Sequence, residues 1–458
     1  MEKLLDIVGK ISGWIWGTPM LVLLVGGGLF LTISLGFFQF RYFGYIIKQT
    51  FGKILSKETS GEGTVTPFQA ATSALASTVG ASNIVGVPVA IMFGGPGAIF
   101  WMWIVALLGS ASKFTEVVLG LKYREKNEEG EWVGGPMYYI EKGLNWKPVS
   151  ILFAFGLMIE LVPSIMVQAN SVAGSAQDMG ISPLITGIIV CILVGLVVVG
   201  GIKRIGSVSE KLVPFMAGLY LIGAGIIILM NIANVPAAFA LIFKHAFQPA
   251  AAVGGFTGAA VAQALRWGVA RGCYSNEAGM GTAPMAHSAA ITDHPVRQGF
   301  WGIFEVIVDT LVICTTTALL ILTTGIWKVE GASQTANALP SMVFTKVYGP
   351  IGGSIVTFSL LCFVVSTIIV IIFYGEKQAE FLFGLKFSKF MRYVYLASIV
   401  IGAVGGAKLL WSFLDILLAL IIVPNMISII ALRKDVIELT REFFTSDLYY
   451  KKDISKSV

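Results

Sequence analysis

Long apolar runs recur along the whole sequence, and they constrain the fold more than any other feature. Eleven of them approach the length of about 20 residues that a helix needs to cross a bilayer. They are residues 18–39, 67–92, 97–121, 149–178, 183–200, 209–231, 253–286, 299–325, 350–381, 391–407 and 411–431. Hydrophobic residues make up 56% of the chain and charged residues 13%, with a mean hydropathy of +0.82. We therefore predict an all-α polytopic membrane protein with 11 transmembrane helices, in one domain over residues 1–458.

The positive charges predict how these helices are oriented. Of the 32 Lys and Arg residues, 23 fall in one alternate set of connecting segments and six in the other. Because cytoplasmic segments carry the excess of Lys and Arg, we expect the richer set inside the cell. The N-terminus then lies outside a plasma or inner membrane, and the tail 433–458 is cytoplasmic. The charged segment 122–148 is expected to form a short amphipathic helix on the membrane surface.

Motifs of several other functional classes are missing from the sequence. The four cysteines form no CxxC pair, and the three histidines form no HExxH motif. There is no G-x-x-x-x-G-K-[ST] sequence, so nothing indicates that ATP drives the protein directly. The basic residues follow the membrane topology, which argues against a nucleic-acid partner. We predict that the chain is not an enzyme and that its surroundings are lipid.

Polar residues interrupt the run that lies between Thr64 and Trp103. Residues 77–86 read STVGASNIVG, with two glycines and four side chains that can form hydrogen bonds. In a membrane, backbone groups released from a helix must be satisfied by protein, ions or water. Such a break favours a site for a small polar solute. The alternative is close helix packing through small residues.

A second break supports the solute site. When residues 18–39 are set aside as an extra N-terminal helix, the other ten runs divide into residues 66–232 and 253–432. Five is odd, so the second block crosses the membrane in the opposite sense to the first. Each block opens with a glycine-interrupted run, and the second interruption is residues 268–284, GVARGCYSNEAGMGTAP. Paired broken helices in two inverted halves are typical of a transporter binding site.

The two breaks resemble a known family. Residues 77–103, STVGASNIVGVPVAIMFGGPGAIFWMW, and 271–284, RGCYSNEAGMGTAP, resemble the alanine/glycine:cation symporters, also called sodium:alanine symporters, and the likeness covers almost the whole chain. The core more distantly resembles LeuT-type transporters of the APC superfamily, with a 5+5 inverted repeat and broken first and sixth core helices. The resemblance implies a secondary active symporter. It would couple sodium influx to uptake of a small neutral amino acid, alanine or glycine, by alternating access.

The resemblance also implies a sodium site. In LeuT-type transporters the eighth core helix carries a hydroxyl pair, which here corresponds to Ser366 and Thr367. These hydroxyls would bind the co-transported sodium ion together with the carbonyl oxygens of Ala76, Val79 and Phe363. Sodium prefers several hard oxygen ligands. The alternative is that both hydroxyls bond only to their own helix, as is common in membrane helices.

An amino-acid zwitterion needs donors for its carboxylate and acceptors for its ammonium group. The carboxylate is assigned to the N–H groups of Gly80, Ala81, Ser82 and Asn83, at the N-terminus of a half-helix. Carbonyl groups near Thr78 and in the second break are expected to take the ammonium group.

Further side chains are candidates for the same substrate pocket. Gln168 and Asn170 lie in the third core helix, where one side of the pocket is expected, and their alternative is an interhelical hydrogen bond. The second break adds three candidates, Tyr274, Ser275 and Asn276. Acidic residues within spans are candidates for function in general, and they are Glu160, Glu277, Asp309 and Asp415. A pair between Arg271 and Glu277 that holds the second break is the structural alternative.

Two other functions stay open on the sequence. A proton could replace sodium if a lysine of the fifth core helix reached the ion site, and Lys211 lies at the edge of that helix. The same fold could also serve as a channel or receptor, although a channel needs a continuous polar stripe and these spans have local breaks.

Overall fold

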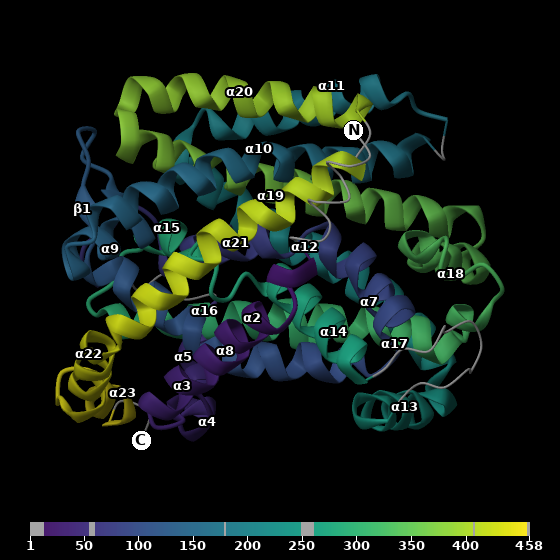
Figure 1. Ribbon diagram of the computed structural model, residues 1–458, viewed down its shortest axis with the longest axis horizontal. Coiled ribbons are helices and arrows are strands. Elements are labelled where there is room, and N and C mark those ends of the chain that lie inside the picture. Colours follow the sequence, from purple (N-terminus) through teal and green to yellow (C-terminus); the bar gives the residue numbers. More distant parts are fainter. Residues whose placement is uncertain (1–12, 55–59, 178–179, 249–260, 406–407, 456–458) are drawn as a thin grey trace.

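The computed structural model describes residues 13–54, 60–177, 180–248, 261–405 and 408–455 of the chain. Its regular elements are helices apart from a two-stranded antiparallel hairpin, β1 (Glu125–Lys126) and β2 (Trp132–Val133) (Figure 1). The predicted start of the second block, residues 253–260, and the side chain of Asp415 lie outside what the structure describes.

The first half consists mainly of helices, in the following order. They are α2 (Thr18–Leu21), η1 (Val22–Gly26), α3 (Gly27–Ser34), α4 (Phe38–Arg41), α5 (Phe43–Thr50), η2 (Phe51–Lys53), α6 (Pro67–Thr78), η3 (Ser82–Gly86), α7 (Val87–Gly94), α8 (Ala98–Lys122), α9 (Pro136–Leu144), α10 (Lys147–Gln177), α11 (Pro183–Val198), α12 (Gly201–Met230), η4 (Ile232–Asn234) and α13 (Val235–Phe247). The predicted extra helix 18–39 corresponds to α2, η1 and α3, which end at Ser34.

The second half mixes short helices with long ones. They are α14 (Val261–Asn276), α15 (Ala283–His287), α16 (Pro295–Val306), η5 (Ile307–Cys314), α17 (Thr315–Thr324), η6 (Ile326–Lys328), η7 (Ala336–Ala338), α18 (Leu339–Tyr348), α19 (Pro350–Phe383), α20 (Leu385–Val404), α21 (Lys408–Ala431), α22 (Arg433–Thr445) and α23 (Tyr450–Ser455). Elements α16, η5 and α17 form one apolar stretch, residues 295–324.

Several helices have the length and composition of membrane spans. In the described part of the chain, six helices meet both criteria, or up to eight if each bent pair is one span. Shorter apolar helices, including α11 and residues 18–34, fall below a full bilayer crossing. The chain is thus a helical protein with several candidate spans, and the number 11 stays a prediction.

The segment 122–148 differs from the surface helix that its charge predicts. It forms the β1–β2 hairpin and then α9, whose residues 136–140 are all buried. The Ser150 hydroxyl also donates to the Met137 carbonyl oxygen at 2.9 Å, which ties α9 to the start of α10. The apolar first turns of α9 pack into the protein because they meet partner helices there, which a sequence pattern cannot reveal.

Burial separates the interior helices from those at the surface. The most apolar 18-residue stretches of α8 and α19 are 83% and 78% buried. The corresponding stretch of α12 is only 28% buried. Helix α11 exposes leucine and isoleucine side chains along its length, such as Leu184, Ile188 and Leu196. Exposed apolar faces of this extent fit a lipid environment. Helices α8 and α19 thus form the core, and α6 packs against α19 while α14 packs against α8.

Candidate functional site

The first break separates two helices of one apolar run. Helix α6 begins at Pro67 after a capping box, in which the Thr66 and Gln69 side chains each accept from the other's backbone N–H. The helix ends at Thr78, and Val79 leaves helical geometry with ψ 85°. The following helical segment, η3 and α7, continues at an angle of 46° to α6. Backbone groups released at this bend need partners within the protein or from a ligand.

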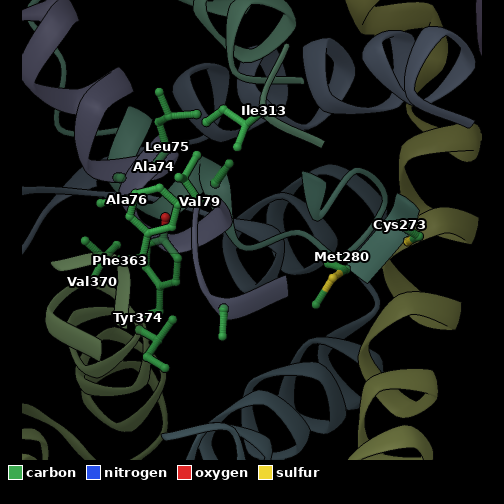
Figure 2. Close-up of a cluster of buried hydrophobic side chains, with 14 of the residues drawn as sticks. Ala74, Leu75, Ala76, Val79, Cys273, Met280, Ile313, Phe363, Val370 and Tyr374 are labelled. Carbon is green, nitrogen blue, oxygen red and sulfur yellow. The ribbon is translucent and has the colours of Figure 1, made fainter. Parts of the chain in front are cut away.

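Oxygen atoms gather where this break meets α19. The Thr367 hydroxyl oxygen lies 3.0 Å from the Ala76 carbonyl oxygen, 3.5 Å from that of Val79 and 2.9 Å from that of Phe363. Figure 2 shows Phe363 of α19 beside Ala76 and Val79. One hydroxyl carries one proton, so it can satisfy only one of these carbonyl groups fully at a time. The remaining lone pairs of this hard oxygen set suit a small cation.

The two predicted hydroxyls behave differently. The Ser366 hydroxyl donates to the Phe363 carbonyl oxygen at 2.8 Å and lies 3.2 Å from the Met216 sulfur of α12. Successive helical residues point about 100° apart, so Thr367 faces the break while Ser366 faces α12. The sequence analysis left open that both hydroxyls bond only to their own helix. That alternative fits Ser366 better than Thr367.

Gly80 brings the break close to two other elements. A Cβ atom at this position would lie 2.9 Å from the Thr367 hydroxyl oxygen and 3.4 Å from the Gln168 Nε2 atom. Because real Cβ atoms essentially never approach another heavy atom within 3.0 Å, a side chain here would displace Thr367. Only glycine permits this close approach of the backbone.

Two of the four amides expected to bind a carboxylate are already engaged. The Gly80 N–H donates to Asn83 Oδ1 at 3.0 Å, and the Asn83 N–H donates to the Gly80 carbonyl oxygen at 3.3 Å. The first N–H groups of a helix have no partner within it. The amides of Ala81 and Ser82, at the start of the second segment, are therefore the ones available to an anionic group.

The Asn83 and Ser275 side chains both contact a buried carboxylate, that of Asp309. Asn83 Nδ2 donates to Asp309 Oδ1 at 2.6 Å and to the Ser275 hydroxyl at 3.1 Å. The Ser275 and Thr310 hydroxyls both donate to Asp309 Oδ2 at 2.8 Å. This network joins the first break, α14 and η5. The side chains of Asn83 and Ser275 thus hold the two breaks together.

Two other predicted substrate residues also make structural bonds. Asn276 Nδ2 donates to the Thr310 hydroxyl at 3.1 Å, and its Oδ1 accepts from the Ala278 N–H at 3.0 Å. Asn170 Nδ2 donates to the carbonyl oxygens of Gly402 and Gly405 at 3.2 and 2.7 Å. Asn170 therefore makes an interhelical hydrogen bond, which was the alternative to a role in the substrate pocket.

The second break is a loop between α14 and α15 that requires left-handed backbone geometry. Glu277, Gly279 and Gly281 have φ values of 55°, 91° and 79°. Side chains of α8 hold this loop from the other side. Lys113 Nζ donates to the Asn276 carbonyl oxygen at 3.1 Å, and Glu116 Oε1 accepts from the Gly281 N–H at 3.0 Å.

Glu277 is held within this loop by hydroxyl groups. Its Oε2 atom accepts from the Thr282 hydroxyl at 2.5 Å and from the Ser77 hydroxyl at 3.2 Å. The Arg271 guanidinium instead lies over the Trp267 ring, 5.2 Å from its centroid. Hydroxyl donors therefore hold Glu277 in the second break, in place of the Arg271 pair considered above.

A cavity lies between the two breaks, α10 and α19. Five of the predicted site residues line it: Thr78, Ser82, Gln168, Tyr274 and Thr367. The other lining residues are Ser77, Glu160, Leu161, Ser164, Glu277, Met280, Thr282, Ile371 and Leu418. The volume of the cavity is about 30 Å³, which is room for about two water molecules.

Sequence periodicity could have found more of this lining. Glu160, Ser164 and Gln168 follow one another at intervals of four, so they share one face of α10. Of these three residues, the sequence analysis above assigns only Gln168 to the pocket and places Glu160 among the acidic residues within spans. Thr282 carried no such signal, because it depends on the path of the irregular loop.

Comparison with known proteins identifies the family. The sequence model of the sodium:alanine symporter family matches residues 1–456 of this chain. The chain belongs to this family. It is thus a transporter and a multi-pass membrane protein, and not an enzyme. This confirms the resemblance drawn from the two breaks.

Individual relatives agree with the family, and a solved structure shares the fold. The chain is 57% identical to the uncharacterized transporter YflA of Bacillus subtilis (strain 168), covering 100% of this chain and 97% of YflA. It is 40% identical to the sodium/alanine symporter AgcS of Methanococcus maripaludis, over 96% and 97% of the two chains. The fold is similar to that of MhsT, crystallised with L-phenylalanine, with a TM-score of 0.56 at 13% identity over 81% of this chain and 89% of MhsT.

Proposed function

We propose that this symporter couples inward sodium movement to uptake of a small neutral amino acid, alanine or glycine. The observation that carries the proposal is the group of oxygens around Thr367, which borders directly on the cavity between the breaks. The relative AgcS is named a sodium/alanine symporter, which supports sodium as the ion and alanine as the substrate.

The proposed sodium site consists of Thr367 with the carbonyl oxygens of Ala76, Val79 and Phe363. These four oxygens belong to α6 and α19, so an ion held by them would fix the two helices against each other. Ser366 contributes indirectly, since its hydroxyl shares the Phe363 carbonyl oxygen with Thr367. Binding of sodium by hard oxygens of this type needs no acidic cluster.

The proposed substrate site is the adjoining cavity. We assign the carboxylate to the amide groups of Ala81 and Ser82, where the helix dipole favours negative charge. Oxygens around Thr78 and the second break take the ammonium group. Tyr274 and Gln168 line the sides of the cavity and limit the length of the side chain that fits.

Ion and substrate are coupled because both depend on the first break. The carbonyl groups of Ala76 and Val79 face the ion, and the amides of Ala81 and Ser82 face the substrate. Filling either site orders the same few residues, so each ligand raises the affinity for the other by the same factor. Alternating access then requires the bundle that contains both broken helices to rock against the remaining helices.

The membrane arrangement is part of the proposal. Residues 66–232 and 253–432 form two inverted repeats of five helices after the extra N-terminal helix. The N-terminus lies outside and the tail 433–458 inside, in accordance with the charge distribution. Residues 1–458 form a single transporter domain.

The alternatives receive less support. Proton coupling through a lysine would need that lysine at the Thr367 oxygens, whereas Lys211 is exposed on α12. A channel would need a continuous polar path, whereas the cavity lining includes apolar residues such as Leu161 and Ile371.

Uptake and counterflow of labelled alanine in proteoliposomes test the proposal. We expect accumulation against a gradient when sodium is high outside, and none when lithium or a proton gradient replaces it. Equal uptake without sodium would contradict sodium coupling, and downhill flux without accumulation would favour a channel.

A further inference from the structure

Helices α4 and α5 present one face with large exposed aromatic side chains. Residues 37, 40, 44, 48 and 51 are all exposed and recur at intervals of three or four, which is the spacing of one helix face. The exposed aromatic side chains of this face and its edge are Phe37, Phe40, Phe43 and Phe51, each more than 40% exposed. A contiguous exposed apolar surface of this kind marks a site of contact with another molecule or with a membrane.

The opposite face of the same helices is packed against the protein. The Phe38 ring lies 4.2 Å from the Phe114 ring of α8, and the Tyr42 ring stacks on that of Phe444 in α22 at 3.9 Å. Figure 1 shows α5 close to the C-terminal helices α22 and α23, and Tyr45 binds Asp453 of α23 there. The exposed aromatic face therefore belongs to helices that the protein holds firmly in place.

The position of α4 along the chain places this face at the membrane surface. The apolar helical stretch 18–34 ends only four residues before α4 begins. Its end is closed by two hydrogen bonds at 2.9 Å, from the Gly36 N–H to the Ile33 carbonyl oxygen and from the Phe37 N–H to that of Thr32. Gly36 and Phe37 both have left-handed geometry, with φ values of 65° and 57°. The chain thus turns at once into α4, and an amphipathic helix at such a place lies in the plane of the bilayer interface.

Positive charges accompany the aromatic side chains. From residue 35 to residue 57 the sequence contains four Lys and Arg residues and no Asp or Glu. Arg41 and Lys48 are exposed on α4 and α5, and within the described part of the chain neither forms an ion pair. Their long side chains can extend from an apolar surface to a charged group at the membrane boundary. This combination of aromatic and basic groups is complementary to lipids with acyl chains and an anionic head group.

We propose that α4 and α5 form an in-plane membrane helix that binds anionic phospholipid. The phenylalanines lie among the acyl chains, and Arg41 and Lys48 bind the lipid phosphate. The distribution of Lys and Arg places this site in the cytoplasmic leaflet. The inference concerns the membrane surface and not the transported solute, so it goes beyond the proposed function and does not depend on sodium or alanine.

Lipid binding to the purified full-length protein tests the proposal. Native mass spectrometry compares the retention of phosphatidylglycerol with that of phosphatidylcholine, both added to the protein in detergent. We expect the wild type to prefer phosphatidylglycerol. Each basic residue near an anionic surface contributes roughly fivefold in affinity, so Arg41→Gln/Lys48→Gln should bind phosphatidylglycerol roughly 25-fold more weakly. Binding of phosphatidylcholine should not change, and Arg41→Lys/Lys48→Arg should bind like the wild type.

A matched variant controls for net charge. Lys126→Gln/Lys142→Gln removes the same number of charges from the β1–β2 hairpin and α9, and it should keep the preference for phosphatidylglycerol. Loss of the preference in this control as well, or its absence from the wild type, would contradict a site at Arg41 and Lys48. Displacement of the lipid by inorganic phosphate would show that an isolated anion occupies the site, which would also overturn the proposal.

The depth of the aromatic face is a second, independent readout. A spin label is attached at Phe40→Cys in a Cys191→Ser background, since the other three native cysteines are buried, and the protein is reconstituted in liposomes. We expect the label to collide more with oxygen than with a water-soluble nickel complex, as at Ile192→Cys on the apolar surface of α11. Glu128→Cys on the hairpin should show the opposite ratio. An aqueous signal at position 40, or a disulfide there between two copies of the chain, would refute the membrane contact.

Discussion

The Thr367 hydroxyl oxygen lies 3.0 Å from the carbonyl oxygen of Ala76, although 291 residues separate the two in sequence. This contact joins α19 to the end of α6, where the helix stops and its carbonyl groups lose their usual donors. The same two helices enclose one side of the cavity. An ion bound between them would therefore act on the substrate site through the shape of the break.

The proposed sodium site predicts that the neighbouring Thr367 and Ser366 hydroxyls affect sodium activation to different extents. Thr367→Ala should raise the sodium concentration for half-maximal uptake roughly tenfold or more, since a hydrogen bond to a charged group contributes about 1.5–3 kcal/mol. Ser366→Ala should have a smaller effect, because that hydroxyl faces Met216. Sodium-dependent alanine uptake measures both, and Thr367→Ser should restore much of the activation.

A matched control lies on the same helix. The Ser359 hydroxyl is buried on α19 without a hydrogen-bond partner in the described chain, so Ser359→Ala removes a buried hydroxyl without removing a bond. We expect wild-type sodium activation in this variant. Unchanged sodium activation in both Thr367→Ala and the Ser366→Ala/Thr367→Ala double variant would contradict the assignment of the sodium site to Thr367.

Gly80 should tolerate no side chain. The Cβ atom of Gly80→Ala would lie 2.9 Å from the Thr367 hydroxyl oxygen, so Thr367 would have to move from the ion site. We expect loss of both sodium activation and alanine binding, and Gly80→Val should be worse. Gly225→Ala is the control, since a Cβ atom there meets nothing within 4 Å, and helical Gly→Ala stabilises by about 1 kcal/mol.

The sequence predicted the class, the two breaks and the family, because these depend on local patterns. Apolar length identifies membrane helices, and a glycine-rich polar interruption is visible without coordinates. It also brought together Ala76, Val79, Phe363 and Thr367, which the structure places within one cluster. This grouping came from the resemblance to a family whose motif spans both helices, and its role in binding sodium stays a prediction.

Side-chain partners were harder to predict, because they depend on distant residues. Asn83, Ser275 and Asn170 are polar residues at the expected depth, yet they bind Asp309 and the backbone near Gly402. Polarity within a span identifies residues that need partners, but it does not say whether a ligand or another helix supplies them. The buried face of α9 was missed for the same reason, since its partners lie elsewhere in the chain.

The cavity should select small side chains. Alanine and glycine should compete strongly for uptake, whereas leucine and phenylalanine should compete weakly, because overpacking a close-packed site costs about 1–3 kcal/mol. The neutral analogue alaninamide should bind poorly, since the amides of Ala81 and Ser82 favour an anion. Equal inhibition by leucine and alanine would refute the size limit, and tight binding of alaninamide would refute the carboxylate orientation.

The C-terminal helix α23 should depend on one carboxylate. Asp453 Oδ2 accepts from the Tyr45 hydroxyl at 2.6 Å and from Arg297 Nη1 at 2.7 Å. Burial alone would raise the pKa of Asp453. The two donors and the Arg297 charge outweigh burial and lower this pKa below its usual 3.8. A lowered pKa means that the stabilisation is complete above pH 3.8 and is lost as the pH falls through the lower folded value.

Hydrogen exchange of residues 446–455 checks this dependence. Asp453→Asn should exchange a few-fold faster than the wild type near pH 7, because a partly exposed pair contributes about 0.2–1 kcal/mol. The difference should persist at pH 5 and disappear well below pH 3.8. An equal exchange rate in both proteins at pH 7 would show that the Asp453 contacts do not hold α23.

The Asn83–Asp309 pair should matter for stability as well as transport. Asn83→Ala removes the 2.6 Å donor from a fully buried carboxylate, which should cost about 1.5–3 kcal/mol and lower the thermal unfolding midpoint of the purified protein. Asp309→Asn removes the charge that needs this donor. The double variant should therefore lose less stability than the sum of the two single losses. Additive losses would mean that Asn83 and Asp309 act separately, and the link between the first break and η5 would then contribute nothing to holding the two breaks together.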